Sequence, residues 1–257
     1  MKNIQKLSGN ALKIIAAVSM LLDHAGLLLF PKATWLRIIG RMAFPIFAFM
    51  IAEGARYTRS RAKYFFTIFG LGAACQIVYY LFSKVMHMSI LLTFSVSILL
   101  IYELQEFKRA FFAKKKDNVK TALLGVLFLG SVAGTYFLME EISFDYGVIG
   151  CMIPVLASLF DFRGIDVPQE IKWLDKLSLR VACLGLGMLF QATYFYLTSK
   201  PHNPMQFFSL FGVALLFLYS GKRGTAKLKY FFYIFYPLHL GLLEGIYMVM
   251  YFIQIYR

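Results

Sequence analysis

Long apolar stretches separated by short charged segments follow one another along the whole chain. Nine of these stretches are long enough to cross most of a bilayer as helices that rise about 1.5 Å per residue. They occupy residues 12–30, 36–53, 64–82, 88–104, 121–139, 145–160, 181–199, 205–221 and 230–253. The sixth is short and contains Pro154, which kinks or ends a helix. The pattern predicts an all-α, polytopic membrane bundle of about nine transmembrane helices, with eight or ten as the neighbouring counts.

The composition supports the same class of protein. Of the 257 residues, 60% are hydrophobic and 16% are charged, and the mean hydropathy is +0.66. Soluble domains carry about a quarter charged residues, and a fold of this size leaves roughly a quarter to a third of its unfolded surface in water. These values exclude an ordinary soluble enzyme. No loop is long enough to fold alone, so residues 1–257 are expected to form a single transmembrane domain.

The positive charges are unevenly distributed between alternate loops. Of the 27 Lys and Arg residues, 20 lie in every second connecting segment, starting with the N-terminal one, and only four lie in the other loops. Because cytoplasmic loops are enriched in Lys and Arg, this bias predicts a cytoplasmic N-terminus. The bias also explains the net charge of +14 without a nucleic-acid partner.

Four ionisable residues gather in the outer parts of the first two predicted spans. Asp23 and His24 are in the first, and Arg37 and Arg41 are in the second. His24 and Arg41 are each about 9 Å below the outer end of their helix, so the two share one layer. Adjacent helical residues point about 100° apart, so Asp23 is expected to neutralise an arginine while His24 faces the bundle centre. The alternative is a purely structural ion pair with a hydrogen-bonded histidine, but the second arginine favours an anionic or polarised ligand.

Lys13 extends this polar stripe along the first span. It precedes His24 by eleven residues, which returns to nearly the same helix face about 16 Å away. A chain-like ligand with an anionic head at the inner surface and a reactive tip in the membrane would fit. Glu53 and Glu103 lie near helix ends, where they are expected to reach the headgroups. The four histidines and three cysteines lack metal-ligand spacing, so no metal is expected.

Several stretches closely resemble the TraX family, which is typified by the membrane acetyltransferase that caps the N-terminus of F-type conjugative pilin. The resemblance is dense over residues 7–65 and reappears in two short later blocks. The matching stretches are Leu7-Ser-Gly-Asn-Ala-Leu-Lys13, Met20-Leu-Leu-Asp23-His24, Arg37-Ile-Ile-Gly-Arg41-Met-Ala-Phe44-Pro45, Glu53-Gly-Ala-Arg56-Tyr57-Thr-Arg59, Asp145-Tyr-Gly147 and Tyr236-Pro-Leu-His239.

The resemblance implies an acyltransferase of the bacterial cytoplasmic membrane that moves an acetyl group from cytoplasmic acetyl-coenzyme A to an acceptor at the outer side. The wider superfamily of transmembrane acyltransferases often has an arginine, ten intervening residues and then a histidine on its first span, and here the arginine is replaced by lysine, as Lys13-x10-His24. His24 would act as the base or carry the acetyl group. Arg41, with Arg37, would stabilise the oxyanion or bind phosphates, and Asp23 would hold the arginine.

The resemblance also implies residues that bind the donor and the acceptor. Those expected to bind the coenzyme are Lys13, Arg37, Arg41, Arg56, Tyr57, Arg59 and Arg61, and those expected to bind the acceptor are Asp145, Tyr236 and His239. The sequence does not identify the acceptor, for which a glycan, a lipid headgroup, a small amine or alcohol and a peptide N-terminus are the alternatives. It does not identify the oligomeric state either. The alternative functions are a proton-coupled small-molecule transporter and a non-catalytic membrane scaffold.

Overall fold

The computed structural model describes residues 6–84, 87–225 and 228–255, and its regular structure is helical apart from two isolated bridges. Lys2, Lys227 and Arg257, which contribute to the charge bias, lie outside these residues. The helices are α1 (Gly9–Leu28), α2 (Thr34–Gly40), α3 (Ala43–Tyr57), α4 (Arg61–Ser83), α5 (Ile90–Phe111), α6 (Asn118–Glu141), α7 (Gly147–Ala157), α8 (Leu177–Thr198), α9 (Leu210–Leu216) and α10 (Lys229–Ile255), with 3₁₀ turns η1 (Lys172–Leu174) and η2 (Pro204–Ser209).

Seven helical segments of the described chain are long and apolar enough to cross a membrane, which makes this a multi-pass membrane protein. The segments are Gly9–Leu28, Thr34–Tyr57, Arg61–Leu81, Ile90–Phe111, Asn118–Glu141, Leu177–Thr198 and Tyr230–Ile253. The stretches 145–160 and 205–221, predicted as full spans, instead form the shorter apolar helices Gly147–Ala157 and Pro204–Leu216. The first of these contains Pro154, and the second begins as a 3₁₀ turn.

The chain divides into two compact units, which are described separately. The first unit comprises residues 1–47, 70–86 and 188–257, and the second comprises residues 48–69 and 87–187. Helices α3, α4 and α8 contribute residues to both units.

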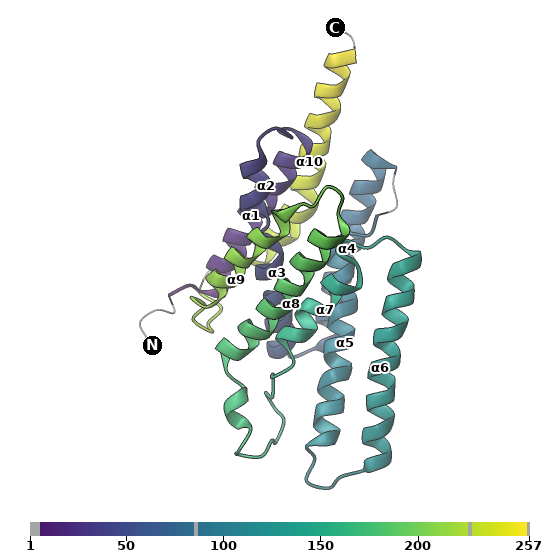
Figure 1. Ribbon diagram of the computed structural model, residues 1–257, viewed down its shortest axis with the longest axis vertical. Helices are drawn as coiled ribbons and strands as arrows, with labels where there is room; N and C mark the ends of the chain where they lie inside the picture. Colours follow the sequence, from purple (N-terminus) through teal and green to yellow (C-terminus); the bar gives the residue numbers. More distant parts are fainter. Residues whose placement is uncertain (1–5, 85–86, 226–227, 256–257) are drawn as a thin grey trace. The chain divides into compact units, whose positions relative to one another are not determined.

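In the second unit, α5 packs against both α6 and α7 (Figure 1). The hydroxyl of Thr93 donates to the carbonyl of Asp145 at 3.0 Å, and that of Ser97 donates to the carbonyl of Cys151 at 2.7 Å. At the other end of α5, Lys108 contacts the backbone that follows α7. Since Thr93 and Lys108 are about 22 Å apart along a helix, the short α7 and its flanking turns run parallel to α5 over most of its length.

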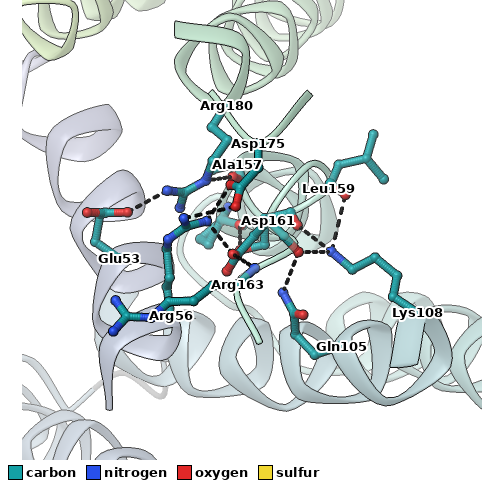
Figure 2. A network of polar contacts seen from close by, with 12 residues as sticks. Glu53, Arg56, Gln105, Lys108, Ala157, Leu159, Asp161, Arg163, Asp175 and Arg180 are labelled. Atoms are coloured by element: carbon teal, nitrogen blue, oxygen red, sulfur yellow. Dashed lines mark hydrogen bonds and ion pairs between the residues drawn. The ribbon is translucent and has the colours of Figure 1, made fainter. Parts of the chain in front are cut away.

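Lys108 closes the C-terminal end of α7. Its ammonium donates to the carbonyls of Ser158, Leu159 and Asp161 at 2.9, 3.2 and 2.7 Å, and Gln105 donates to the same Asp161 carbonyl at 3.3 Å (Figure 2). The last carbonyls of a helix have no partner within the helix, and a cation beside them is favourable. Lys108 therefore supplies a donor to the Leu159 carbonyl and a second donor to the carbonyls of Ser158 and Asp161, which also accept from the amide of Asp161 and from Gln105.

Two buried ion-pair groups hold the loop between α7 and α8. Arg56 at the end of α3 contacts Asp161 and donates to Asp175 at 2.7 Å (Figure 2). Arg180 donates to Glu53 at 2.6 Å and to the carbonyl of Ala157 at 3.1 Å. Glu53 is only 6% exposed, so the expectation that it reaches the headgroups is wrong, because a buried arginine pairs with it.

In the first unit, α1 begins beside the loop that precedes α10. Ser8 caps α1 by accepting a hydrogen bond from the amide of Ala11 at 3.2 Å, and the amides of Gly9 and Asn10 donate to the carbonyls of Lys222 and Arg223. Leu7 bridges to Tyr219 just after α9, while η2 packs on α2. The segment from η2 to Tyr219 therefore runs antiparallel to α1. It starts near α2, which follows the C-terminal end of α1, and it ends near the N-terminal end of α1.

Replacement of Lys108 by methionine should destabilise the protein. Lys108→Met leaves the three carbonyls after α7 without this donor, at an expected cost of about 2–3 kcal/mol. Lys114→Met is the matched control, because Lys114 pairs with Asp166 while its side chain is 89% exposed, and such pairs contribute little. Chemical unfolding of both variants in detergent measures the difference, and equal stability of the two would contradict a capping role for Lys108.

Candidate active site

The predicted second span is interrupted at the position of its buried arginine. Helix α2 ends at Gly40, α3 begins at Ala43, and the amide of Met42 bonds to the Ile39 carbonyl in a tight turn. Pro45 explains the break, because it has no N–H for the carbonyl of Arg41 four residues earlier and its ring crowds that carbonyl. Pro45 itself lies in the first turn of α3, where proline is tolerated. The break therefore places Arg41 at a helix junction inside the apolar layer.

Two glycines allow α1 and α2 to approach closely beside this junction (Figure 1). A Cβ atom on Gly40 would lie 2.7 Å from the Cα and 2.6 Å from the Oδ1 of Asp23. A Cβ atom on Gly26 would lie 2.8 Å from the Cβ of Leu36. Any side chain at Gly40 would therefore push Asp23 away from α2.

Asp23 joins the two arginines of the second span. Arg41 contacts its carboxylate through one Nη atom, and the Nε of Arg37 lies 3.4 Å from Oδ1. The side chains of Asp23 and Arg41 are 15% and 7% exposed, so the pair is shielded from solvent. This is the contact that the sequence spacing predicts.

His24, the next residue along α1, meets His239 of α10. The Nδ1 of His24 lies 3.0 Å from the Nε2 of His239, and the Nδ1 of His239 lies 2.8 Å from the carbonyl of Phe235. His239 is 4% exposed, whereas His24 is only partly buried. A partly buried imidazole that bonds a second, buried imidazole suits proton transfer to a bound molecule.

Aromatic rings surround the buried side of this pair. Phe235 lies parallel to the ring of His239, with centroids 4.9 Å apart, and Tyr236 meets the same ring at 6.3 Å. Tyr236 is buried and also contacts Phe47 of α3 at 5.4 Å. Tyr236 and His239, predicted to bind the acceptor, are thus both brought to the neighbourhood of His24.

Lys13, predicted to bind the coenzyme, lies on α1 near the basic loop before α10. Arg223 of that loop is within electrostatic reach of Lys13, and its carbonyl accepts the hydrogen bond from Asn10. The loop thus adds a second cation beside Lys13, about 16 Å along α1 from His24.

The remaining predicted residues belong to the second unit, and most have partners there. Arg56 is bound by Asp161 and Asp175, and Arg61 donates to Glu106 at 2.5 Å. The guanidinium of Arg163 covers the ring of Tyr57 at 4.0 Å, while Arg59 is exposed. The backbone of Asp145 bonds to Met88 and Thr93.

Sequence analysis missed the direct contact between the two histidines. His24 and His239 are 215 residues apart, and nothing in either helix indicates which face of α10 meets α1. The signal that existed was the presence of an imidazole deep in each apolar span. The break before Pro45 and the role of Gly40 were also missed, although the sequence shows a Gly40-Arg41 pair with a proline four residues after the arginine.

Comparison with known proteins gives matches over most of the chain. The model of the TraX protein family matches residues 8–247. The probable fimbrial assembly protein FimC, serogroup H1, of Dichelobacter nodosus is 28% identical over 250 residues, or 90% of this chain and 92% of the relative. The uncharacterized protein RP591 of Rickettsia prowazekii (strain Madrid E) is 53% identical over 38 residues, 15% of each chain. No solved structure matches the chain.

Loss of the Asp23 charge should be costly. Asp23→Asn leaves buried arginines without this counter-charge, and breaking such a pair costs about 3–5 kcal/mol. Glu106→Gln is the matched control, because Glu106 also bonds two arginines, Arg61 and Arg109, but its side chain is 42% exposed. The control should lose about 1 kcal/mol or less. Unfolding measurements that show equal losses would contradict a shielded pair at Asp23.

A methyl group at Gly40 should separate α1 from α2. Gly40→Ala forces a backbone shift at Asp23, for which about 1–3 kcal/mol of destabilisation is expected. Gly130→Ala on α6 is the control, since nothing lies within 4 Å of a Cβ atom there, and it should be neutral or stabilising by up to about 1 kcal/mol. Melting temperatures of the two variants check this, and an unchanged value for Gly40→Ala would show that the close approach is unnecessary.

Proposed function

The chain belongs to the TraX family, and on that premise we propose that it is a membrane-embedded acetyltransferase that uses acetyl-coenzyme A. The observation that carries the proposal is the group around His24. A partly exposed imidazole rests on a buried imidazole, and its chain neighbour Asp23 holds two arginines at the same depth. A base next to guanidinium groups is what transfer of an acyl group requires, since a proton leaves the acceptor and negative charge develops on the acyl oxygen.

Each step of the transfer has a residue to perform it. His24 takes the proton from the acceptor hydroxyl or amine as that oxygen or nitrogen bonds to the acetyl carbon. Arg41, aided by Arg37, stabilises the negative charge on the acetyl oxygen, while Asp23 keeps Arg41 in place. As the carbon–sulfur bond breaks, His24 returns the proton to the departing thiolate. The products are the acetylated acceptor and free coenzyme A.

Lys13 and Arg223 are the residues that we assign to the anionic head of the donor. They lie together at the start of α1, and Lys13 is on nearly the same face as His24, about 16 Å along the helix. Arg56 and Arg61 already bond carboxylates, so their charges are largely offset. An extended donor along α1 would bring its thioester to His24.

The donor side of the proposal depends on membrane orientation. The Lys and Arg bias favours a cytoplasmic start of α1 in the cytoplasmic membrane. If α7 and the η2–α9 segment cross together with the seven long segments, the chain makes nine crossings. Lys13 would then face the cytoplasm, where acetyl-coenzyme A is made, and His24 would lie nearer the outer side.

The acceptor belongs to the class of hydroxyls and amines exposed at that outer side, namely a glycan, a lipid headgroup, a small amine or alcohol, or a peptide N-terminus. The D. nodosus relative carries the name of a probable fimbrial assembly protein, so the N-terminal amine of a fimbrial subunit is the first acceptor to assay.

Labelled acetyl-coenzyme A added to inverted membrane vesicles tests the activity. Vesicles from cells that make the protein expose the cytoplasmic face and retain native acceptors. Wild-type vesicles should transfer label and release coenzyme A, and His24→Ala should lower the rate by a factor of about 10²–10⁴. His202→Ala is the control, because His202 lies in an exposed turn and bonds the carbonyl of Tyr196.

Two results would contradict the acetyltransferase. One is transfer by His24→Ala at the wild-type rate, which would leave the site without its base. The other is uptake of a small molecule that depends on the protein while no acetyl group is transferred, which would favour a transporter.

A further inference from the structure

The two histidines form a directed chain of hydrogen bonds. The planes of the rings differ by only 4°, and their centroids are 5.1 Å apart. This separation is close to the 3.0 Å between the bonded nitrogens plus the two ring radii, so the imidazoles meet edge to edge. In that arrangement the lone pair of one nitrogen points at the N–H of the other, which is the geometry of a linear hydrogen bond.

The carbonyl of Phe235 sets the direction of this chain. A carbonyl only accepts, so the Nδ1 of His239, 2.8 Å away, carries a proton. In the neutral ring the Nε2 of His239 is then an acceptor, and the facing Nδ1 of His24 must donate to it. The Nε2 of His24 is left with the lone pair.

We propose that His239 is a positioning residue that fixes His24 in its Nδ1-protonated form, so that the Nε2 of His24 is the basic nitrogen of the site. The kinetic part rests on the proposed acetyl transfer, whereas the protonation state does not. His239 therefore acts through His24 and does not need to touch the acceptor.

The arrangement replaces the carboxylate that orients a catalytic histidine in other enzymes, where that contact selects the tautomer and stabilises the imidazolium. Asp23 does not serve this role here, because it is bound to Arg41 and Arg37. A neutral imidazole can serve, since its Nε2 accepts the His24 proton without adding a negative charge beside the arginines.

The proton balance of the step is simple. The acceptor's proton moves to the Nε2 of His24 as the acyl–acceptor bond forms, which gives His24 two N–H groups. The positive charge is shared with His239 through the hydrogen bond between the Nδ1 of His24 and the Nε2 of His239, while the Nδ1–H of His239 still donates to the carbonyl of Phe235. When the carbon–sulfur bond breaks, the Nε2 proton passes to the thiolate and both rings are neutral again.

Nitrogen-15 NMR of histidine-labelled protein in nanodiscs tests the protonation state without any activity. The signals of His24 and His239 are assigned by their loss in single substitutions. We expect a protonated Nδ1 and an unprotonated Nε2 in both rings. We also expect a scalar coupling across the hydrogen bond between the Nδ1 of His24 and the Nε2 of His239. A proton on the Nε2 of His24 would overturn the proposal, whether or not the protein transfers acetyl groups.

Two substitutions of His239 test the kinetic consequence. His239→Leu removes the hydrogen-bond acceptor for the Nδ1 proton of His24 and puts an apolar side chain of similar bulk in its place. We therefore expect kcat to fall by about 10²–10⁴, while KM for acetyl-coenzyme A and for the acetyl acceptor stays the same. His239→Gln offers an amide oxygen near the position of Nε2 and should recover most of the lost rate.

The kcat and KM values of the variants distinguish a positioning role of His239 from acceptor binding, and the wild-type results separate the assigned tautomer from the acetyltransferase proposal. A raised acceptor KM with unchanged kcat in His239→Leu would show that His239 binds the acceptor and would overturn the positioning role. Equal loss of kcat in the Leu and Gln variants would also overturn it. If wild-type protein shows the expected protonation but no acetyl transfer, the acetyltransferase proposal fails and the assigned tautomer stands.

Discussion

The ion pair between Asp23 and Arg41 is the interaction on which the first unit depends. A carboxylate and a guanidinium in an apolar layer are stable only in contact, so the two helices must approach closely at that depth. Gly40 leaves room for the approach, and the break enforced by Pro45 puts Arg41 at the junction. His24 follows Asp23 in the chain, so the same contact fixes the depth at which its imidazole is presented.

The buried polar clusters of the two units have different roles. In the second unit, Lys108, Arg56 and Arg180 bond backbone carbonyls and carboxylates, and they hold the turn after α7. In the first unit, Asp23 contacts both Arg37 and Arg41, and His24 bonds His239. The cluster of the second unit therefore has a structural role, whereas the cluster of the first unit has the positive charge and the lone pair that the proposed acyl transfer requires.

Helix α1 carries both ends of the proposed site. A helix that carries a cation near its start and an imidazole three turns later provides both ends of a path for a long ligand. Bonds to the loop before α10 fix its start, and α2 and α10 fix its far part. In the proposed acetyltransferase, such a helix would keep the distance between the donor's head site and the reactive site constant, which favours reaction of a donor of matching length.

The sequence by itself determined the membrane class, most of the spans and the grouping of Asp23, His24 and Arg41, because apolar length and helical spacing are local properties. It also located Lys13 on the face of His24. It did not determine that Glu53 and Lys108 are buried among partners, because a charge near a helix end looks alike whether it faces headgroups or a folded loop. Only the tertiary structure decided that His239 meets His24, since the rotation of α10 against α1 depends on packing between helices that are 215 residues apart at this contact.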